Sequence, residues 1–254
     1  MIYDVLETRI ARIPRIDADD FLARFEILGN VGLGVWHWGL HDGDDLISVI
    51  TFGTTCFGGK RGWIAKVAIT NGVRVLQLCR GGTLPDITKG VPSRAISLAC
   101  KAMRQVYGPF IAVAYADEAL GEIGTIYQAS GALYTGMTKP KGQANYLIDG
   151  KLKSAWQVRR IFGTRDRKCL AKIDPNIKVI LLKPKHRYLF VCAHKEVKKR
   201  IMNALAEYIR PYPKRHLTSL GDPQPCLPLS KSIMTNSPIT TGHQCVEPLL
   251  SVEK

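Results

Sequence analysis

Long hydrophobic runs are absent from this sequence of 254 residues. No stretch approaches the roughly 20 consecutive apolar residues that a membrane-spanning helix needs. Residues Met1 to Arg15 also lack the order of a charged segment followed by an apolar one that is typical of a signal peptide. With 46% hydrophobic residues, the chain can bury a proper core. We therefore expect a globular, cytoplasmic protein that does not enter a membrane.

Paired cysteines are missing as well. The seven cysteines are odd in number, widely scattered and never spaced as CxxC. This pattern argues against a disulfide framework and against a zinc site, so we interpret all of them as reduced. The Gly-rich stretch 54–70 lacks the GKS or GKT ending of a phosphate-binding P-loop, and we expect an irregular loop there.

Acidic residues are scarce in one part of the chain only. Residues 1–150 contain 15 Lys and Arg against 14 Asp and Glu, whereas residues 151–215 contain 19 against 4. Residues 216–254 contain 2 against 3, so one segment carries the whole net charge of +15. A charge surplus for solubility would be spread out, so this segment predicts a docking surface for a polyanion, most simply nucleic acid. A merely basic, solvated face is the alternative.

Apolar periodicity in the first part of the chain predicts a mixed α/β fold. The expected elements are a short helix within 17–29, a hairpin turning at Asp42-Gly43, a strand over 73–80, a helix beginning near Ser93, a strand over 110–117, a helix within 121–131 and a strand over 133–136. Glu26 lies in the first helix, and the pattern leaves open whether it is a surface carboxylate or part of a site. We expect one domain over 1–140.

The basic segment predicts a separate appendage over 141–215. We expect a hairpin at Asp149-Gly150, two short helices joined at Gly163-Thr164 with Thr164 as an N-cap, two strands and an amphipathic helix. Cations cluster on the two short helices, where we expect contacts to phosphates before base readout: Arg159, Arg160, Arg165, Arg167, Lys168 and Lys172. Pro, Ser and Thr dominate 216–254, which predicts a disordered tail.

Asp117 is the first candidate for a functional residue. It follows an apolar, β-prone run that begins at Phe110, and this is typical of a buried strand ending at a sheet edge. In open α/β sheets, ligands bind beyond the carboxyl ends of the strands. The position of Asp117 therefore predicts a site at this edge.

The turn before the helix near Ser93 is the second candidate. Free backbone N–H groups at a helix start bind anions, and Lys89, Gly90, Ser93 and Arg94 lie at this start. They are our candidates for binding the pyrophosphate of a cofactor. An ordinary capped helix is the alternative, because Ser93 also suits an N-cap.

The order strand, strand, loop, strand, anion-ready loop, helix, strand, helix, strand resembles the GNAT acyltransferase fold. In that fold two neighbouring strands splay apart to hold an acyl-CoA thioester, and a later helix presents a tyrosine. The stretch GTIYQASGALYTGM over 124–137 is similar to the tyrosine-bearing segment, and Tyr127 matches the general-acid tyrosine. The resemblance implies a central mixed sheet flanked by helices, with acetyl-CoA or a related acyl-CoA as cofactor.

Four short motifs narrow the resemblance: LCR at 78–80, PSRAIS at 92–97, YAD at 115–117 and GEIGTIYQA at 121–129. Together they resemble the phage DNA-modification proteins of the Mom type, over roughly Phe21 to Met137. The resemblance implies an anti-restriction enzyme of the host-cell cytoplasm that places a carbamoylmethyl group on the exocyclic amine of adenine in double-stranded DNA. The family's pocket residues carry over as Arg80, Ser93, Asp117 and Tyr127.

One family feature has no match in this chain. A His-Tyr-bearing stretch lies upstream in the family, but FEILG at 25–29 occupies that region here, so the resemblance carries over no iron ligands. Two other functions stay open. One is an acyl-CoA-dependent N-acyltransferase acting on a small amine or a protein, and the other is a non-catalytic DNA-binding module with a GNAT-like core.

Overall fold

A computed structural model describes residues 7–26, 31–54, 62–118, 121–138, 144–148, 151–181 and 183–214. All of them belong to one compact unit, Met1–Arg215. The tail predicted over 216–254 and the turn predicted at Asp149-Gly150 lie outside the described residues.

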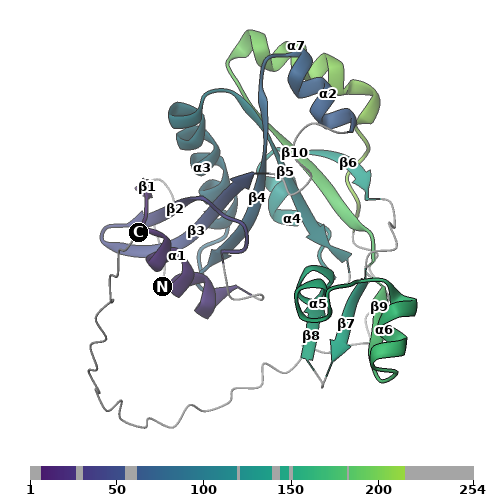
Figure 1. Ribbon diagram of the computed structural model, residues 1–254. Coiled ribbons are helices and arrows are strands. Elements are labelled where there is room, and N and C mark those ends of the chain that lie inside the picture. The colour runs from purple at the N-terminus through teal and green to yellow at the C-terminus, as the bar shows by residue number, and fades with distance from the viewer. Residues whose placement is uncertain are drawn as a thin grey trace, which may run out of the picture. The chain divides into compact units, whose positions relative to one another are not determined.

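A seven-stranded mixed sheet forms the centre of this unit, in the order β1-β2-β3-β4-β5-β10-β6 (Figure 1). Its strands are β1 (Arg9–Arg12), β2 (Trp36–Asp42), β3 (Asp45–Thr54), β4 (Arg74–Thr83), β5 (Phe110–Asp117), β6 (Leu133–Met137) and β10 (Lys185–Cys192). Every pair of neighbours is antiparallel except β4 and β5, which are parallel. The expected mixed α/β class and the hairpin of β2 and β3 are confirmed.

Helices cover both faces of this sheet. They are α1 (Arg15–Phe25), α2 (Trp63–Thr70), α3 (Val91–Tyr107), α4 (Thr125–Ala129) and α7 (Lys195–Leu205), which continues into a 3-10 turn (Ala206–Tyr208). Within the described part of the chain, no helix combines the length and the apolar character that crossing a bilayer requires.

The two faces can be followed along β5, because successive side chains of a strand point to opposite sides. Phe110, Ala112 and Ala114 pack in one core together with α3. Ile111 and Val113 pack in a second core with α2 and α7, which lie side by side. Both faces of β5 are therefore covered by helices, which explains why its sequence is continuously apolar rather than alternating.

The helix α2 was not expected from the sequence, where 54–70 is predicted to be irregular. Residues 55–61 lie outside the described part of the chain, but 63–70 are helical. Trp63, Ile64, Val67 and Ala68 recur at helical spacing and all pack in the second core. The glycines that precede this segment hide that period in the sequence.

Strands β4 and β5 separate along their length. They pair only over Arg74–Gln77 and Phe110–Val113, although β4 continues to Thr83 and β5 continues to Asp117. Beyond this point β4 stays paired with β3, and β5 stays paired with β10 as far as Asp117. The splay that the GNAT resemblance implies is therefore present.

The connection from β6 to β10 contains a small subdomain, which we call the insertion. It consists of β7 (Ala144–Ile148), β8 (Lys151–Ser154), α5 (Ala155–Phe162), α6 (Arg167–Ile173) and β9 (Lys178–Leu181). The three strands form an antiparallel sheet in the order β8-β7-β9. Tyr146, Val158 and Leu170 form its buried core.

The insertion differs in two respects from the appendage expected over 141–215. First, β10 pairs residue for residue with β5 and is therefore a strand of the main sheet. The helix α7 packs in the second core, on one face of that sheet. Second, the N-cap of α6 is Asp166 rather than Thr164. Asp166 Oδ1 accepts hydrogen bonds from the N–H groups of Lys168 (2.9 Å) and Cys169 (3.0 Å), which satisfies two free donors of the helix start.

Candidate active site

A β-bulge positions Arg80 on the splayed part of β4. Thr51 of β3 pairs with Arg80, but the next residue, Phe52, pairs with Leu78, so Cys79 is an extra residue in β4. Leu78 and Cys79 are both buried, whereas Arg80 is partly exposed. Bulges re-aim the side chains beside them, and this one turns Arg80 away from the core.

The helix α1 brings a carboxylate to Arg80. Gly82 of β4 allows a close approach of α1, because a Cβ added there would lie 2.9 Å from Leu22 Cδ2. Glu26, at the C-terminal end of α1, then places its Oε1 3.8 Å from Arg80 Nε. The Arg80 Nη1 donates to the carbonyl of Cys79 at 2.8 Å. Glu26 is thus a largely buried partner of Arg80 rather than a surface carboxylate, and its role in a site stays a prediction.

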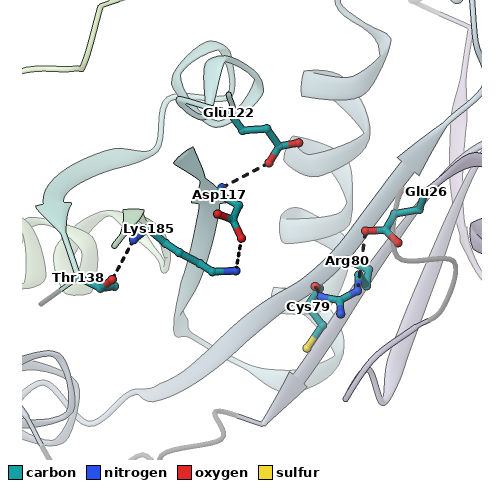
Figure 2. A network of polar contacts seen from close by, with 7 residues as sticks. All are labelled: Glu26, Cys79, Arg80, Asp117, Glu122, Thr138 and Lys185. Atoms are coloured by element: carbon teal, nitrogen blue, oxygen red, sulfur yellow. Dashed lines mark hydrogen bonds and ion pairs between the residues drawn. The ribbon is translucent and has the colours of Figure 1, made fainter. Parts of the chain in front are cut away.

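Asp117 ends β5 in an ion pair with Lys185. The Lys185 Nζ lies 2.6 Å from Asp117 Oδ2, and the two residues are direct partners in the pairing of β5 with β10 (Figure 2). The Asp117 side chain is 25% exposed and that of Lys185 is 39% exposed. The carboxylate is therefore held by Lys185 and remains partly accessible to solvent.

The loop after β5 folds back onto Asp117. The Asp117 N–H donates to Glu122 Oε2 at 3.4 Å, and the Glu122 N–H donates to the Asp117 carbonyl at 3.2 Å. This pair of contacts brings a second, exposed carboxylate beside the first. It also fixes the start of the segment that leads into α4.

The short helix α4 presents Tyr127. Its N-cap, Gly124, has φ 76°, and a Cβ at this position would collide with the ring of Tyr188. Tyr188 is fully buried in β10, and its hydroxyl donates to the carbonyl of Ile123. The Tyr127 ring lies 5.4 Å from the Tyr188 ring and 6.1 Å from the Phe190 ring, centroid to centroid. Close packing on β10 therefore sets the position of Tyr127.

Tyr127 stays protonated in this environment. Burial raises the pKa of its hydroxyl above the ordinary value, and the negative charge of Glu122 raises the pKa further. The positive charge of Arg80 acts in the opposite direction. Arg80 and Glu122 thus both lie close enough to Tyr127 to influence it. A neutral tyrosine here can donate a hydrogen bond or a proton.

Ser93 lies in the first turn of α3 but is not its N-cap. The N-cap is Gly90, with φ 99°, and the Ser93 hydroxyl donates to the Gly90 carbonyl at 2.9 Å. Ser130, which follows α4, approaches the Ser93 carbonyl through its hydroxyl at 3.4 Å. The structure therefore links Ser93 to α4 through its backbone, while its own hydroxyl closes the turn of α3.

The start of α3 offers few donors to a cofactor phosphate. The Val91 N–H donates to the Thr88 carbonyl at 3.2 Å, and Pro92 has no N–H. The backbone N–H groups of Gly90 and Ser93 and the exposed ammonium of Lys89 can face an anion. A Cβ on Gly90 would meet nothing within 4 Å, so approach is open. These residues fit one phosphate group of an acyl-CoA.

Arg94, the remaining candidate for cofactor binding, points elsewhere. Its Nε donates to the Thr8 hydroxyl at 2.7 Å, and its Nη2 donates to the Thr8 carbonyl at 3.4 Å. These bonds tie α3 to the residue that precedes β1. The side chain of Arg94 therefore contacts Thr8 and does not point toward the N–H groups at the start of α3.

The six cations proposed to contact DNA all lie in the insertion, on α5, on α6 and on the loop between them, and all are exposed: Arg159, Arg160, Arg165, Arg167, Lys168 and Lys172. Among the described residues, no three His, Cys, Asp or Glu side chains gather closely enough to hold a metal ion. Part of the FEILG stretch, where the family carries His-Tyr, lies outside the described residues.

Sequence reasoning missed Lys185 and left Glu122 without a role. Lys185 begins the stretch KHRY, but nothing in that stretch shows that it will face Asp117. The contact depends on the register between two strands that are far apart in the sequence. Of the four expected pocket residues, Asp117 contacts Glu122, Tyr127 lies within electrostatic reach of both Glu122 and Arg80, and Ser93 lies beside α4.

Two solved structures illustrate which known proteins have a similar fold. A spermidine N-acetyltransferase from Vibrio cholerae has a TM-score of 0.41 and 10% identity, covering 74% of this chain and 95% of that one. A GNAT-family acetyltransferase from Bacillus cereus has a TM-score of 0.37 and 11% identity, covering 72% of this chain and 96% of that one.

Sequence comparison shows a similarity to Mom proteins that extends well beyond the four short motifs. The methylcarbamoylase mom of Escherichia phage Mu is 28% identical over 181 residues, which are 70% of this chain and 71% of that protein. The model of the Mom protein family matches residues 7–214, from before β1 to the end of the described chain and including the insertion. The chain therefore belongs to the Mom protein family.

Proposed function

We propose that this protein transfers a small carbamoylmethyl or acyl-type group to the exocyclic amine of adenine in double-stranded DNA. Membership of the Mom family makes the chain a transferase, and the related phage Mu protein is named a methylcarbamoylase. Modified DNA would resist restriction, so the enzyme would act in the cytoplasm of an infected host cell.

The observation that carries the proposal is the way Asp117 is held. Lys185 holds Oδ2 at 2.6 Å, and the Asp117 side chain is 25% exposed, so an incoming amine could reach the carboxylate and donate a hydrogen bond to it. Accepting this bond would orient the amine and draw off its proton as the new bond forms. A carboxylate that is held by an ammonium and reaches solvent suits a neutral, weakly nucleophilic amine such as that of adenine.

Tyr127 and Arg80 would stabilise the negative charge that develops during the transfer. Tyr127 is neutral, because burial raises its pKa, and its hydroxyl would donate a hydrogen bond or a proton to the leaving group or to a developing anion. The guanidinium of Arg80 would stabilise the same negative charge electrostatically. Donors that are held in place before the reaction cost no reorganisation during it.

The exposed cations of the insertion support DNA as the substrate. They would neutralise phosphates without reading bases, which holds a duplex near the splayed strands. The exocyclic amine of a stacked adenine is out of reach, so the base would be flipped out at an unstacking cost of a few kcal/mol. For an acyl-type group, the donor would be an acyl-CoA bound through Lys89 and the first turn of α3. The amine nitrogen would form a bond to the acyl carbon, the thioester C–S bond would break, and CoA would leave as its thiol.

Mass spectrometry of nucleosides tests the function. DNA from cells that make the protein is digested, and deoxyadenosine is examined for a mass shift, with Tyr127→Phe as the control. A shifted deoxyadenosine with the wild type and its loss with the variant are expected. No shifted nucleoside in either sample would refute the proposal.

The salt dependence of DNA binding distinguishes the proposed DNA modification from the main alternative, acyl transfer to small amines or proteins. An acyltransferase that acts on small amines or proteins has no use for the exposed cations of the insertion. Phosphate-dominated binding weakens steeply as salt rises. Affinity for duplex DNA that shows this dependence is expected here, and its absence would favour the acyltransferase.

A further inference from the structure

The two stems of the insertion are fastened to each other where they leave the main sheet. Thr138 follows β6, and Lys185 begins β10. The Thr138 N–H donates to the Lys185 carbonyl at 2.8 Å, and the Lys185 N–H donates to the Thr138 hydroxyl at 2.9 Å. We call this reciprocal pair the clasp. It closes the base of the insertion and fixes the backbone of Lys185.

The side chain of Lys185 continues from the clasp to the proposed active site. Lys185 is the direct strand partner of Asp117, so the two side chains leave the same face of the sheet next to each other. The ammonium reaches Asp117 Oδ2 at 2.6 Å (Figure 2). One residue therefore touches both the base of the insertion and the acid.

The cation also balances the charges around Asp117. Glu122 Oε2 lies 3.4 Å from the Asp117 backbone nitrogen, which places a second carboxylate in the neighbourhood. The side-chain charges of Asp117 and Glu122 have the same sign, and the ammonium 2.6 Å from Asp117 Oδ2 offsets their repulsion. Lys185 thereby favours one rotamer of the Asp117 carboxylate.

We propose that Lys185 is a positioning residue that orients Asp117 toward the acceptor amine and anchors this acid to the base of the DNA-binding insertion. The inference rests on the proposed function. Lys185 does not touch the amine; it acts through Asp117. In this arrangement β10, which returns from the insertion, also sets the orientation of Asp117. The start of β10 would then link the part of the protein that holds DNA to the residue that orients the base.

The chain offers a matched control for this role. Lys183 is exposed and lies two residues before Lys185, so Lys183→Met makes the same change of charge and size without touching Asp117. Lys185→Arg keeps a cation, and Thr138→Ser keeps the hydroxyl that Thr138→Val removes. The measurements are the fraction of modified deoxyadenosine, the affinity for duplex DNA and the melting temperature.

Lys185→Met is expected to lower modification by about 10- to 100-fold, because an error of about 1 Å in placing a reacting group costs up to this much. Lys185→Arg should recover part of the loss, and Lys183→Met should match the wild type. Lys185→Met and Lys183→Met should bind DNA equally well. Thr138→Val should lower modification more than Thr138→Ser does.

Three results would overturn the proposal. The first is modification by Lys185→Met at the level of Lys183→Met. The second is a larger loss of DNA affinity in Lys185→Met than in Lys183→Met, because Lys185 would then act as a phosphate anchor. The third is a fall in melting temperature that Lys185→Arg repairs without restoring modification, because Lys185 would then serve stability alone.

A second measurement does not depend on base modification. Amine acetylation by a limiting reagent, followed by peptide mass spectrometry, compares the reactivity of Lys185 with that of Lys183. The ion pair should make Lys185 severalfold less reactive, and Asp117→Asn should remove the difference. If the wild type modifies no DNA, the proposed function fails, and equal reactivity of the two lysines in the wild type would refute the pairing separately.

Discussion

The splayed strands and the insertion handle charge in opposite ways. Around β4 and β5, cations and carboxylates come together, with Lys185 beside Asp117 and Arg80 beside Glu26. In the insertion, α5 and α6 expose a surplus of cations to solvent. Ion pairs within the protein hold side chains in one geometry. Exposed cations suit binding to a polyanion, which supplies the negative charge.

The same contrast holds for packing. Tyr127 rests on Tyr188 and Phe190 of β10, which belong to the large core shared with α3. Among the side chains that the structure describes in the insertion, the buried core consists of Tyr146, Val158 and Leu170. We therefore expect the chemical site to be rigid and the insertion to be the less stable region.

The largest effect should come from a variant that lacks the proposed proton donor but still binds DNA. Tyr127→Phe should lower the modified fraction of deoxyadenosine by about 10²- to 10⁴-fold, the usual contribution of a positioned proton donor. Duplex affinity should stay unchanged, because Tyr127 lies outside the insertion. Nucleoside mass spectrometry and fluorescence anisotropy measure the two quantities. A parallel loss of DNA binding would break the division between the regions.

The next largest effect should unfold the insertion alone. Leu170→Ala removes a buried side chain from the small core and should cost about 2–5 kcal/mol locally. Hydrogen exchange should then show lost protection in 144–181, with β3 and β5 unchanged. Ala substitution of the exposed neighbour Cys169 is the control. Equal loss of protection in β5 would mean that the insertion and the main sheet unfold together.

Weakening the anchor should have a smaller effect. Arg159→Gln combined with Arg160→Gln should lower the slope of log affinity against log salt by about 1.8, or 0.9 for each lost phosphate contact. Between 50 and 200 mM salt, the wild type should then lose about tenfold more affinity than the variant. Lys66→Gln with Lys101→Gln, two exposed cations of the main unit, should leave the slope as it is. Equal slopes in all three proteins would exclude the insertion as the anchor.

The smallest effect concerns the buried hydroxyl of Tyr127. Its folded pKa is raised above the unfolded value of about 10, so above pH 10 the unfolded chain loses a proton that the folded chain keeps. This contribution to the free energy of unfolding is complete below pH 10 and falls above it, by at most about 1.4 kcal/mol per pH unit. Denaturant titrations at pH 10 and 11 should show a smaller fall in Tyr127→Phe. Because burial also raises the pKa of Tyr134 and Tyr188, some fall should remain, and identical falls would contradict the burial of Tyr127.

Several elements followed from local pattern. The apolar, β-prone run that begins at Phe110 predicted a buried strand, which is β5, and Asp42-Gly43 predicted the hairpin between β2 and β3. Two local signals misled. Gly-rich neighbours hid α2, and Asp166 rather than Thr164 caps α6, because Asp166 sits where its carboxylate reaches two free N–H groups.

The sequence by itself determined which segment of the chain carries the surplus charge, and the family resemblance of its short motifs predicted Arg80, Ser93, Asp117 and Tyr127 as one pocket. Only the tertiary structure decided that β10 returns to the main sheet, and that Lys185 therefore faces Asp117. The physical reason is register. A shift of one residue between β5 and β10 would turn Lys185 to the other face, and packing of both faces of the sheet fixes that register, not any local pattern.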